Sequence, residues 1–134
     1  MTPDEVVESA RRCVGARFRP QGRDPQTGLD CVGVAAVAMD KTMPPACYPQ
    51  RGQDGRMFAM VAEAMGLWTI FPGEARAGDL LMVEPGPGQV HMVVITPTGF
   101  VHSDVRLRKV VETPGRPEWP VLAAWRGCSD QPGD

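Results

Sequence analysis

The sequence predicts an α+β domain in which N-terminal helices pack on a C-terminal antiparallel sheet of about five to six strands. Helix-start signals and apolar residues at helical spacing fall within residues 2–66. After residue 78, short runs rich in Val, Ile and Leu are separated by turn residues, which is typical of strands. Helices that precede strands in this way favour an α+β arrangement. The length of 134 residues suits one domain with a buried core.

The first helix is expected to begin directly after Thr2. Thr2 is placed as the N-cap, Pro3 takes the first helical position, and Glu5 completes a T-x-x-E capping box. Apolar residues then recur at helical spacing, at Val6, Val7, Ala10 and Cys13. Gly15 is the expected end of the helix.

The second helix is expected in the apolar run "CVGVAAVAM", residues 31–39, after a loop over residues 16–28 that is rich in Gly, Pro and Asp. Asp30 can serve as its N-cap, because a carboxylate there accepts from a free backbone N–H of the first turn. This placement puts Cys31 in the first turn of the helix.

A third helix is expected over residues 54–65, where Gly66 provides a natural stop. The predicted strands follow at residues 79–84, 90–96, 99–103, 106–112 and 121–126. No repeat or linker interrupts the chain. We therefore predict a single catalytic domain over residues 1–127 and a flexible tail over residues 128–134.

The charge balance limits the partners of the chain. Its net charge is −2, from 14 basic and 16 acidic residues, so we expect no nucleic-acid partner. Five arginines nevertheless gather early, at Arg11, Arg12, Arg17, Arg19 and Arg23. We interpret them as a solvated face, and the alternative is a patch that binds an anionic polymer such as cell wall.

The four cysteines are widely and irregularly spaced, at Cys13, Cys31, Cys47 and Cys128. No C-x-x-C pair is present, which argues against a zinc ribbon or a thioredoxin-like site. We expect reduced thiols, of which all except Cys31 are packing or bystander residues.

The chain start lacks the basic and apolar segments of a secretory signal. No run reaches the roughly 20 apolar residues that span a bilayer. We therefore expect synthesis in the cytoplasm without a signal peptide, no membrane partner, and export by another route.

The stretch "GLDCVGV", residues 28–34, marks Cys31 as a candidate nucleophile. A helix N-terminus lowers the pKa of a thiol, and its unpaired N–H groups can hold an oxyanion. Gly28 and Gly33 permit tight turning and close approach of the backbone. The alternative is a small buried cysteine that only fills space.

The only two histidines, His91 and His102, lie in strand-like runs on either side of the turn "TPTG". If Thr96 pairs with Gly99, Val93 faces His102, and His91 lies on the same side of the sheet. The two imidazoles are then diagonal neighbours within side-chain reach. A slip of one residue would place them on opposite faces.

These three residues suit acyl-transfer chemistry. Cys31 attacks a carbonyl, His91 takes the thiol proton and returns it to the leaving amine, and His102 orients His91 through the other ring nitrogen. Asp104 has the same strand parity as His102, so it can extend the polar relay.

In order, "GLDCVG", "AGDLLMV", "VHMVVI" and "FVHSD" resemble the NlpC family of cell-wall cysteine peptidases. The resemblance covers about residues 5–126 and implies a papain-like NlpC fold. It also implies that Cys31 is the nucleophile, His91 the base and His102 the orienting residue, with no metal or organic cofactor.

The sequence departs from the pattern of this family at three places. Val32 follows the cysteine where Ser is frequent, Met92 follows the first histidine, and Phe18 lies about where many members carry a Tyr. Backbone N–H groups around Cys31 are left to form the oxyanion hole. The further candidates for the oxyanion or substrate site are Asp30, Val32, Phe18 and Asp104.

The resemblance implies cleavage of peptidoglycan stem peptides, often between D-glutamate and diaminopimelate. The bare domain is similar to small members from phages and gene transfer agents, which implies phage-like tail proteins as partners and a virion-associated enzyme acting in the periplasm. Two alternatives stay open: a non-catalytic structural tail component, and an amidase or acyltransferase with the same Cys–His site.

Overall fold

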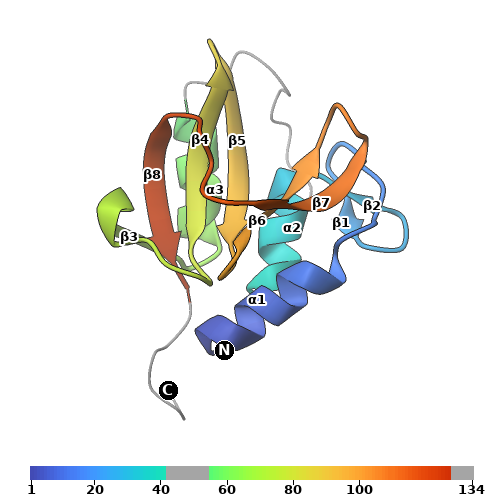
Figure 1. The fold of residues 1–134 in the computed structure, drawn as a ribbon, viewed down its shortest axis with the longest axis horizontal. Coiled ribbons are helices and arrows are strands. Elements are labelled where there is room, and N and C mark those ends of the chain that lie inside the picture. Colours follow the sequence, from blue (N-terminus) through green and yellow to red (C-terminus); the bar gives the residue numbers. More distant parts are fainter. Residues whose placement is uncertain (42–54, 128–134) are drawn as a thin grey trace.

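The computed structural model of the chain describes residues 1–41 and 55–127. The helical elements are α1 (Pro3–Arg12), α2 (Cys31–Ala38), α3 (Arg56–Ala64) and the short 3-10 helix η1 (Pro72–Glu74). The strands are β1 (Arg23–Asp24), β2 (Gly28–Leu29), β3 (Trp68–Ile70), β4 (Leu80–Gly86), β5 (Gln89–Ile95), β6 (Gly99–Asp104), β7 (Lys109–Pro114) and β8 (Val121–Arg126). Strands β3 to β8 form one six-stranded antiparallel sheet in the order β3-β8-β4-β5-β6-β7, as Figure 1 shows. The predicted α+β class is confirmed.

The first helix forms as its end signals predict. The Oγ1 atom of Thr2 accepts from the N–H of Glu5 at 3.2 Å, and the Glu5 carboxylate accepts from the N–H of Thr2 at 2.9 Å. The capping box is therefore complete, and α1 turns Val6 and Ala10 into the core.

Helix α2 is the central helix, because it is apolar on all sides and almost completely buried. It starts at Cys31, and the Asp30 carboxylate accepts from the N–H of Gly33 at 2.8 Å. A side chain at Gly33 would collide with the carbonyl oxygen of Gly22. Glycine here lets the loop before α2 pack directly on the first turn of the helix.

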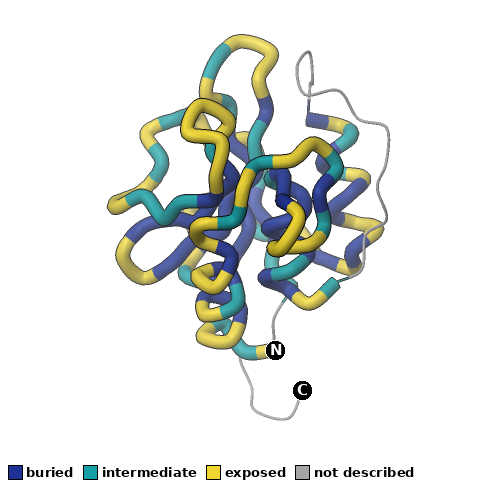
Figure 2. Tube along the Cα trace, turned by 90° about the vertical axis from the view of Figure 1, so that its right-hand side faces the viewer, coloured by how far each residue is buried: buried dark blue, intermediate teal, exposed yellow. Residues whose placement is uncertain are grey.

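The two faces of the sheet carry separate apolar clusters. Alternate β5 residues, Val90, Met92 and Val94, face the cluster that contains the buried side chains of all three α-helices. On the other face, Val93 and Ile95 join a smaller cluster with residues of β4, β6 and β8. The chain between β7 and β8 crosses this second face (Figure 1). Figure 2 shows buried residues toward the inside of the molecule and exposed residues along its outer loops and helical turns.

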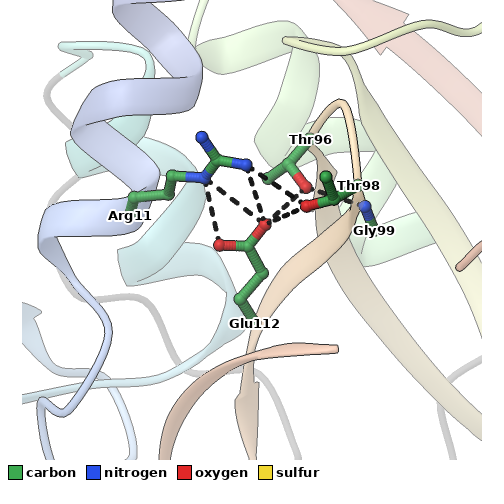
Figure 3. Close-up of polar contacts among 5 residues, drawn as sticks. All are labelled: Arg11, Thr96, Thr98, Gly99 and Glu112. Atoms are coloured by element: carbon green, nitrogen blue, oxygen red, sulfur yellow. Dashed lines mark hydrogen bonds and ion pairs between the residues drawn. The ribbon is translucent and has the colours of Figure 1, made fainter. Parts of the chain in front are cut away.

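Glu112 of β7 links α1 to the β5–β6 hairpin (Figure 3). Its carboxylate accepts from Arg11 at 3.0 Å, from the hydroxyl of Thr96 at 2.7 Å and from that of Thr98 at 3.1 Å. The hydrogen bond from Arg11 is the largest cause that lowers the pKa of Glu112. Thr96 also pairs with Gly99 at the end of the hairpin, so this cluster holds the predicted turn in place.

Three local predictions differ from the structure. The predicted loop over residues 16–28 contains the short β1–β2 pair, and β3 adds an unpredicted edge strand beside β8. Residues 106–108, predicted as strand, form the turn before β7, where the Asp104 carboxylate accepts from the N–H groups of Arg106 and Leu107. Carboxylates commonly hold turns in this way. Cys47, Cys128 and the predicted tail over residues 128–134 lie outside the described residues.

Within the described parts of the chain, no helix has the length and apolar character that crossing a bilayer requires.

Candidate active site

The first turn of α2 reaches the sheet where two neighbouring strands separate. Strands β5 and β6 pair at Val94–Val101 and Ile95–Phe100, and the ladder ends there. Beyond this point the Ser103 hydroxyl donates to the carbonyl of Leu29 at 2.8 Å. The segment that leads into α2 therefore lies against β6 where the β5–β6 ladder has ended.

The Cys31 thiol lies beside a backbone N–H of β5 that a continued β5–β6 ladder would have paired with β6. In a continued ladder Met92 would face Ser103, and its N–H would point toward β6. Instead, the N–H of Met92 acts on the Cys31 sulfur and lowers the pKa of the thiol, as do the N–H groups of Val32 and of Cys31 itself. The sulfur is thereby held next to β5, beside the residue that follows His91.

The two imidazoles form the predicted pair. Nε2 of His91 lies 2.8 Å from Nδ1 of His102, and the ring centroids are 5.0 Å apart at 74°. The observed pairing of Val94 with Val101 is the register predicted from the turn. A one-residue slip would have separated the rings, so the turn sequence sets this part of the site.

The hydrogen-bond partners indicate how the protons are arranged. His91 can donate from Nε2 to His102 Nδ1, and His102 can donate from Nε2 toward the Thr113 hydroxyl, 3.4 Å away. In this tautomer Nδ1 of His91 carries no proton. It is the ring nitrogen that can accept one from a thiol.

Burial keeps the resting thiol and imidazole neutral. It raises the pKa of Cys31 to about 12, aided by the Asp30 charge and opposed by the three backbone N–H groups. Burial also lowers the pKa of His91 to about 3, helped by His102 and opposed by the charge of Asp104. The N–H groups at the helix N-terminus do lower the thiol pKa, as expected, but desolvation of the thiolate exceeds their effect, so the net pKa of the thiol is raised.

Replacing Asp30 with asparagine is expected to lower the pKa of Cys31. The amide removes a charge that disfavours the thiolate, while its oxygen can still cap Gly33. We expect iodoacetamide to alkylate Cys31 roughly threefold to tenfold faster at pH 8, measured on the Cys31 peptide by mass spectrometry. Asp24→Asn removes the same charge from an exposed site in the β1–β2 pair and should leave the rate unchanged. Equal rates in the two variants would contradict the assignment.

An aromatic wall stands against the imidazole pair. The Trp119 ring centroid lies 6.4 Å from that of His91 and 5.9 Å from those of His102 and Phe100. Phe100 also contacts His102, at 5.0 Å. The sequence offered one signal for Trp119, a tryptophan in the Pro-rich connection "PGRPEWP", and that signal does not reveal which residues the ring contacts.

Of the four further candidates, Asp30 and Val32 lie at the thiol. Asp30 is the N-cap of α2 and is ion-paired with Arg23 at 2.9 Å, and the backbone N–H of Val32 lowers the pKa of the Cys31 thiol. The other two act less directly. Phe18 is half-buried beneath the guanidinium of Arg108. Asp104 caps the turn that follows it. Burial lowers the pKa of both histidines, and the charge of Asp104 opposes this lowering.

The arrangement supplies a sulfur, a proton acceptor and backbone donors at one place, which is what nucleophilic attack on a carbonyl requires.

In residues 1–41 and 55–127, no three His, Cys, Asp or Glu side chains come together as a metal-binding group.

Comparison with known proteins shows similarity at the level of three-dimensional structure. No protein-family model and no curated protein matches the chain. Among solved structures, the NlpC/p60 domain of the peptidoglycan hydrolase SagA is 20% identical with a TM-score of 0.59, over 85% of this chain and 90% of that one. NlpC1 from Trichomonas vaginalis is 17% identical with a TM-score of 0.67, over 93% of this chain and 44% of that one.

The peptidoglycan hydrolase RipB from Mycobacterium tuberculosis is 21% identical with a TM-score of 0.61, over 95% of this chain and 65% of that one. This chain therefore spans less than half of NlpC1 and about two thirds of RipB. At such identities the similarity concerns the fold. The predicted architecture is confirmed: the chain has the α+β fold of the NlpC/p60 domains.

Proposed function

We propose that the chain is a cysteine endopeptidase that hydrolyses peptide bonds in the stem peptides of peptidoglycan. The observation that carries the proposal is the Cys31 sulfur, held at the N–H of the residue after His91, while His91 is hydrogen-bonded to His102 at 2.8 Å. The similarity in fold to SagA and RipB, both peptidoglycan hydrolases, supports the substrate class.

The proposed reaction begins with the neutral pair. Substrate binding brings a carbonyl carbon to the Cys31 sulfur, and the thiol proton passes to Nδ1 of His91 as the S–C bond forms. His102 accepts from His91 Nε2 and so supports the imidazolium. The backbone N–H groups of Cys31 and Val32 are placed to stabilise the oxyanion.

The second half of the reaction restores the thiol. His91 returns its proton to the amine as the C–N bond breaks, which leaves an acyl group on the sulfur. Water, deprotonated by His91, then attacks the acyl carbon, releases the carboxylate and regenerates the neutral thiol. The low pKa of His91 makes its charged form short-lived, which favours transfer of the proton to the leaving amine.

We further propose that the cleaved bond joins D-glutamate to diaminopimelate, and that the enzyme acts in tail-mediated wall penetration of the phage type, with tail proteins as partners. Both rest on the motif resemblance. A non-catalytic tail component is the second candidate, and the neutral thiol, with its pKa raised to about 12, favours it.

Dye release from labelled, purified sacculi tests the proposal. The wild-type chain should release soluble fragments and Cys31→Ala should release none above the buffer background. Cys13→Ala is the matched control, because Cys13 is a buried core thiol on α1's C-terminal end and should leave release intact. Equal release by the wild-type and Cys31→Ala chains would reject the enzyme. Mass spectrometry of the fragments identifies the bond and separates an endopeptidase from an amidase.

A further inference from the structure

Five exposed basic residues come from two segments that are far apart in the sequence and side by side in the fold. We call this the basic surface: Arg17, Arg19, Arg106, Arg108 and Lys109, all exposed. The segments lie side by side, because Arg17 forms an antiparallel bridge with Lys109 and the N–H of Phe18 donates to the carbonyl of Arg108 at 3.0 Å. Arg17 and Arg19 pack against Gly28 on one side of their extended segment, and Arg108 lies over the ring of Phe18 on the other side.

The charges of the basic surface are not neutralised within the described residues. Of the early arginines, Arg11 pairs with Glu112, Arg12 with Glu8 and Arg23 with Asp30. No member of the basic surface forms an ion pair with another residue in ranges 1–41 and 55–127. Since the whole chain has a net charge of −2, the surface concentrates positive charge against the overall balance.

Arg108 occupies a backbone position that favours glycine. Its φ is +59°, in the left-handed region, which costs a non-glycine residue roughly 1 kcal/mol or more. Its guanidinium carbon lies 5.9 Å from the centroid of the Phe18 ring, close enough for a cation–π contact. The turn therefore carries an arginine, whose guanidinium lies over Phe18, at a position where glycine would cause less backbone strain.

The basic surface borders the candidate active site. Leu29, two residues before Cys31, donates to the carbonyl of Arg17 at 2.9 Å and accepts from the N–H of Arg19 at 3.3 Å. On the other segment, Arg106 follows shortly after His102, in the turn capped by Asp104. A polymer that lies on these cations therefore contacts the two segments that lead to Cys31 and from His102.

We propose that the basic surface binds the carboxylate-bearing strands of peptidoglycan and delivers their stem peptides to Cys31. The inference rests on the proposed function, because peptidoglycan is chosen as the polyanion through the adjoining site. Guanidinium groups suit this partner, since they form bidentate hydrogen bonds with carboxylates. Duplex DNA is the competing polyanion and serves as an outcome of the test.

Co-sedimentation with purified sacculi at increasing NaCl tests the surface, with Cys31→Ala as the parent so that the substrate is not consumed. Arg106→Gln/Arg108→Gln in this parent should bind roughly fivefold more weakly at low salt and show a shallower salt dependence. The control Arg12→Gln/Lys41→Gln removes two charges outside the surface and should bind like the parent. Arg108→Gly should weaken binding while its melting temperature stays equal or rises, because glycine fits the turn.

Converting the sacculus carboxylates to amides should remove the salt-dependent binding. Equal binding by the surface and control variants, or tighter binding of duplex DNA through the same arginines, would overturn the inference. If the wild-type chain releases fragments and the surface variants bind like the control, the basic surface is rejected and the enzyme stands. If the parent binds through the surface and the wild-type chain releases nothing, the endopeptidase is rejected and the surface stands.

Discussion

Replacing His91 with glutamine is expected to slow the proposed hydrolysis of peptidoglycan by roughly two to four orders of magnitude, the usual contribution of a general base. The thiol has a pKa of about 12, so it needs an acceptor for its proton, and Nδ1 of His91 is the acceptor in the tautomer set by His102. Glutamine has a similar length and cannot take the proton. Initial rates of dye release measure the loss, and a rate within about threefold of the wild type would exclude His91 as the base.

Two variants of His102 test whether this residue orients His91, because one keeps the hydrogen bond to His91 and the other removes it. Asparagine can still present an oxygen to the Nε2–H of His91, whereas alanine leaves that N–H without the partner it has at 2.8 Å. We expect His102→Asn to keep most of the rate and His102→Ala to lose about tenfold. Equal rates for these two variants would remove the orienting role of His102 and leave that of His91 untouched.

His91→Gln should also change how the free energy of unfolding depends on pH. The folded-state pKa of about 3 lies below the ordinary 6.5, so on acidification the unfolded chain binds a proton first. The wild type should therefore lose stability as the pH falls below 6.5 toward 3, by about 1 kcal/mol per pH unit from this residue. The variant should show a smaller slope in urea titrations over that range. An unchanged slope would mean that His91 is not buried as a neutral ring.

Replacing Asp79 with alanine is expected to destabilise the domain by about 3 kcal/mol. Asp79 is fully buried and receives two hydrogen bonds from Arg126, each 2.9 Å long, and a third at 2.9 Å from the N–H of Arg76. Alanine removes the Asp79 countercharge from the largely buried guanidinium of Arg126. For a domain of this size the melting temperature should fall by about 10 °C.

Two controls separate this effect from charge removal in general. Glu8→Ala breaks the exposed Glu8–Arg12 pair on α1 and should change the unfolding free energy by less than about 0.5 kcal/mol. The double variant Asp79→Ala/Arg126→Met should lose less stability than the sum of the two single variants, because both changes remove the same ion pair. Urea denaturation measures both, and a loss below about 1 kcal/mol for Asp79→Ala would show that the pair is not buried as described.

Cap and turn residues in the sequence were sufficient to predict the elements that are held by hydrogen bonds among neighbouring residues. The capping box at Thr2 and Glu5 is formed, α2 starts at Cys31 under the Asp30 cap, and the "TPTG" turn sets the register that joins the two histidines. Each of these features depends on residues within about a dozen positions of one another. The edge strand β3 was missed because it forms against the distant strand β8. The β1–β2 pair is local, but its two-residue strands are too short to show the alternation of a strand.

The sequence alone therefore determined the fold class, the first turns of α1 and α2, and the pairing of His91 with His102. The tertiary structure decided where the Cys31 sulfur lies, how strongly burial opposes its ionisation, that Trp119 stands beside the imidazoles, and that two arginine-bearing segments lie side by side. The physical reason is the sequence distance between the residues that interact. Caps and turns are local hydrogen bonds, whereas desolvation, the separation of β5 from β6 and the sum of surface charges depend on residues that only the folded chain brings together.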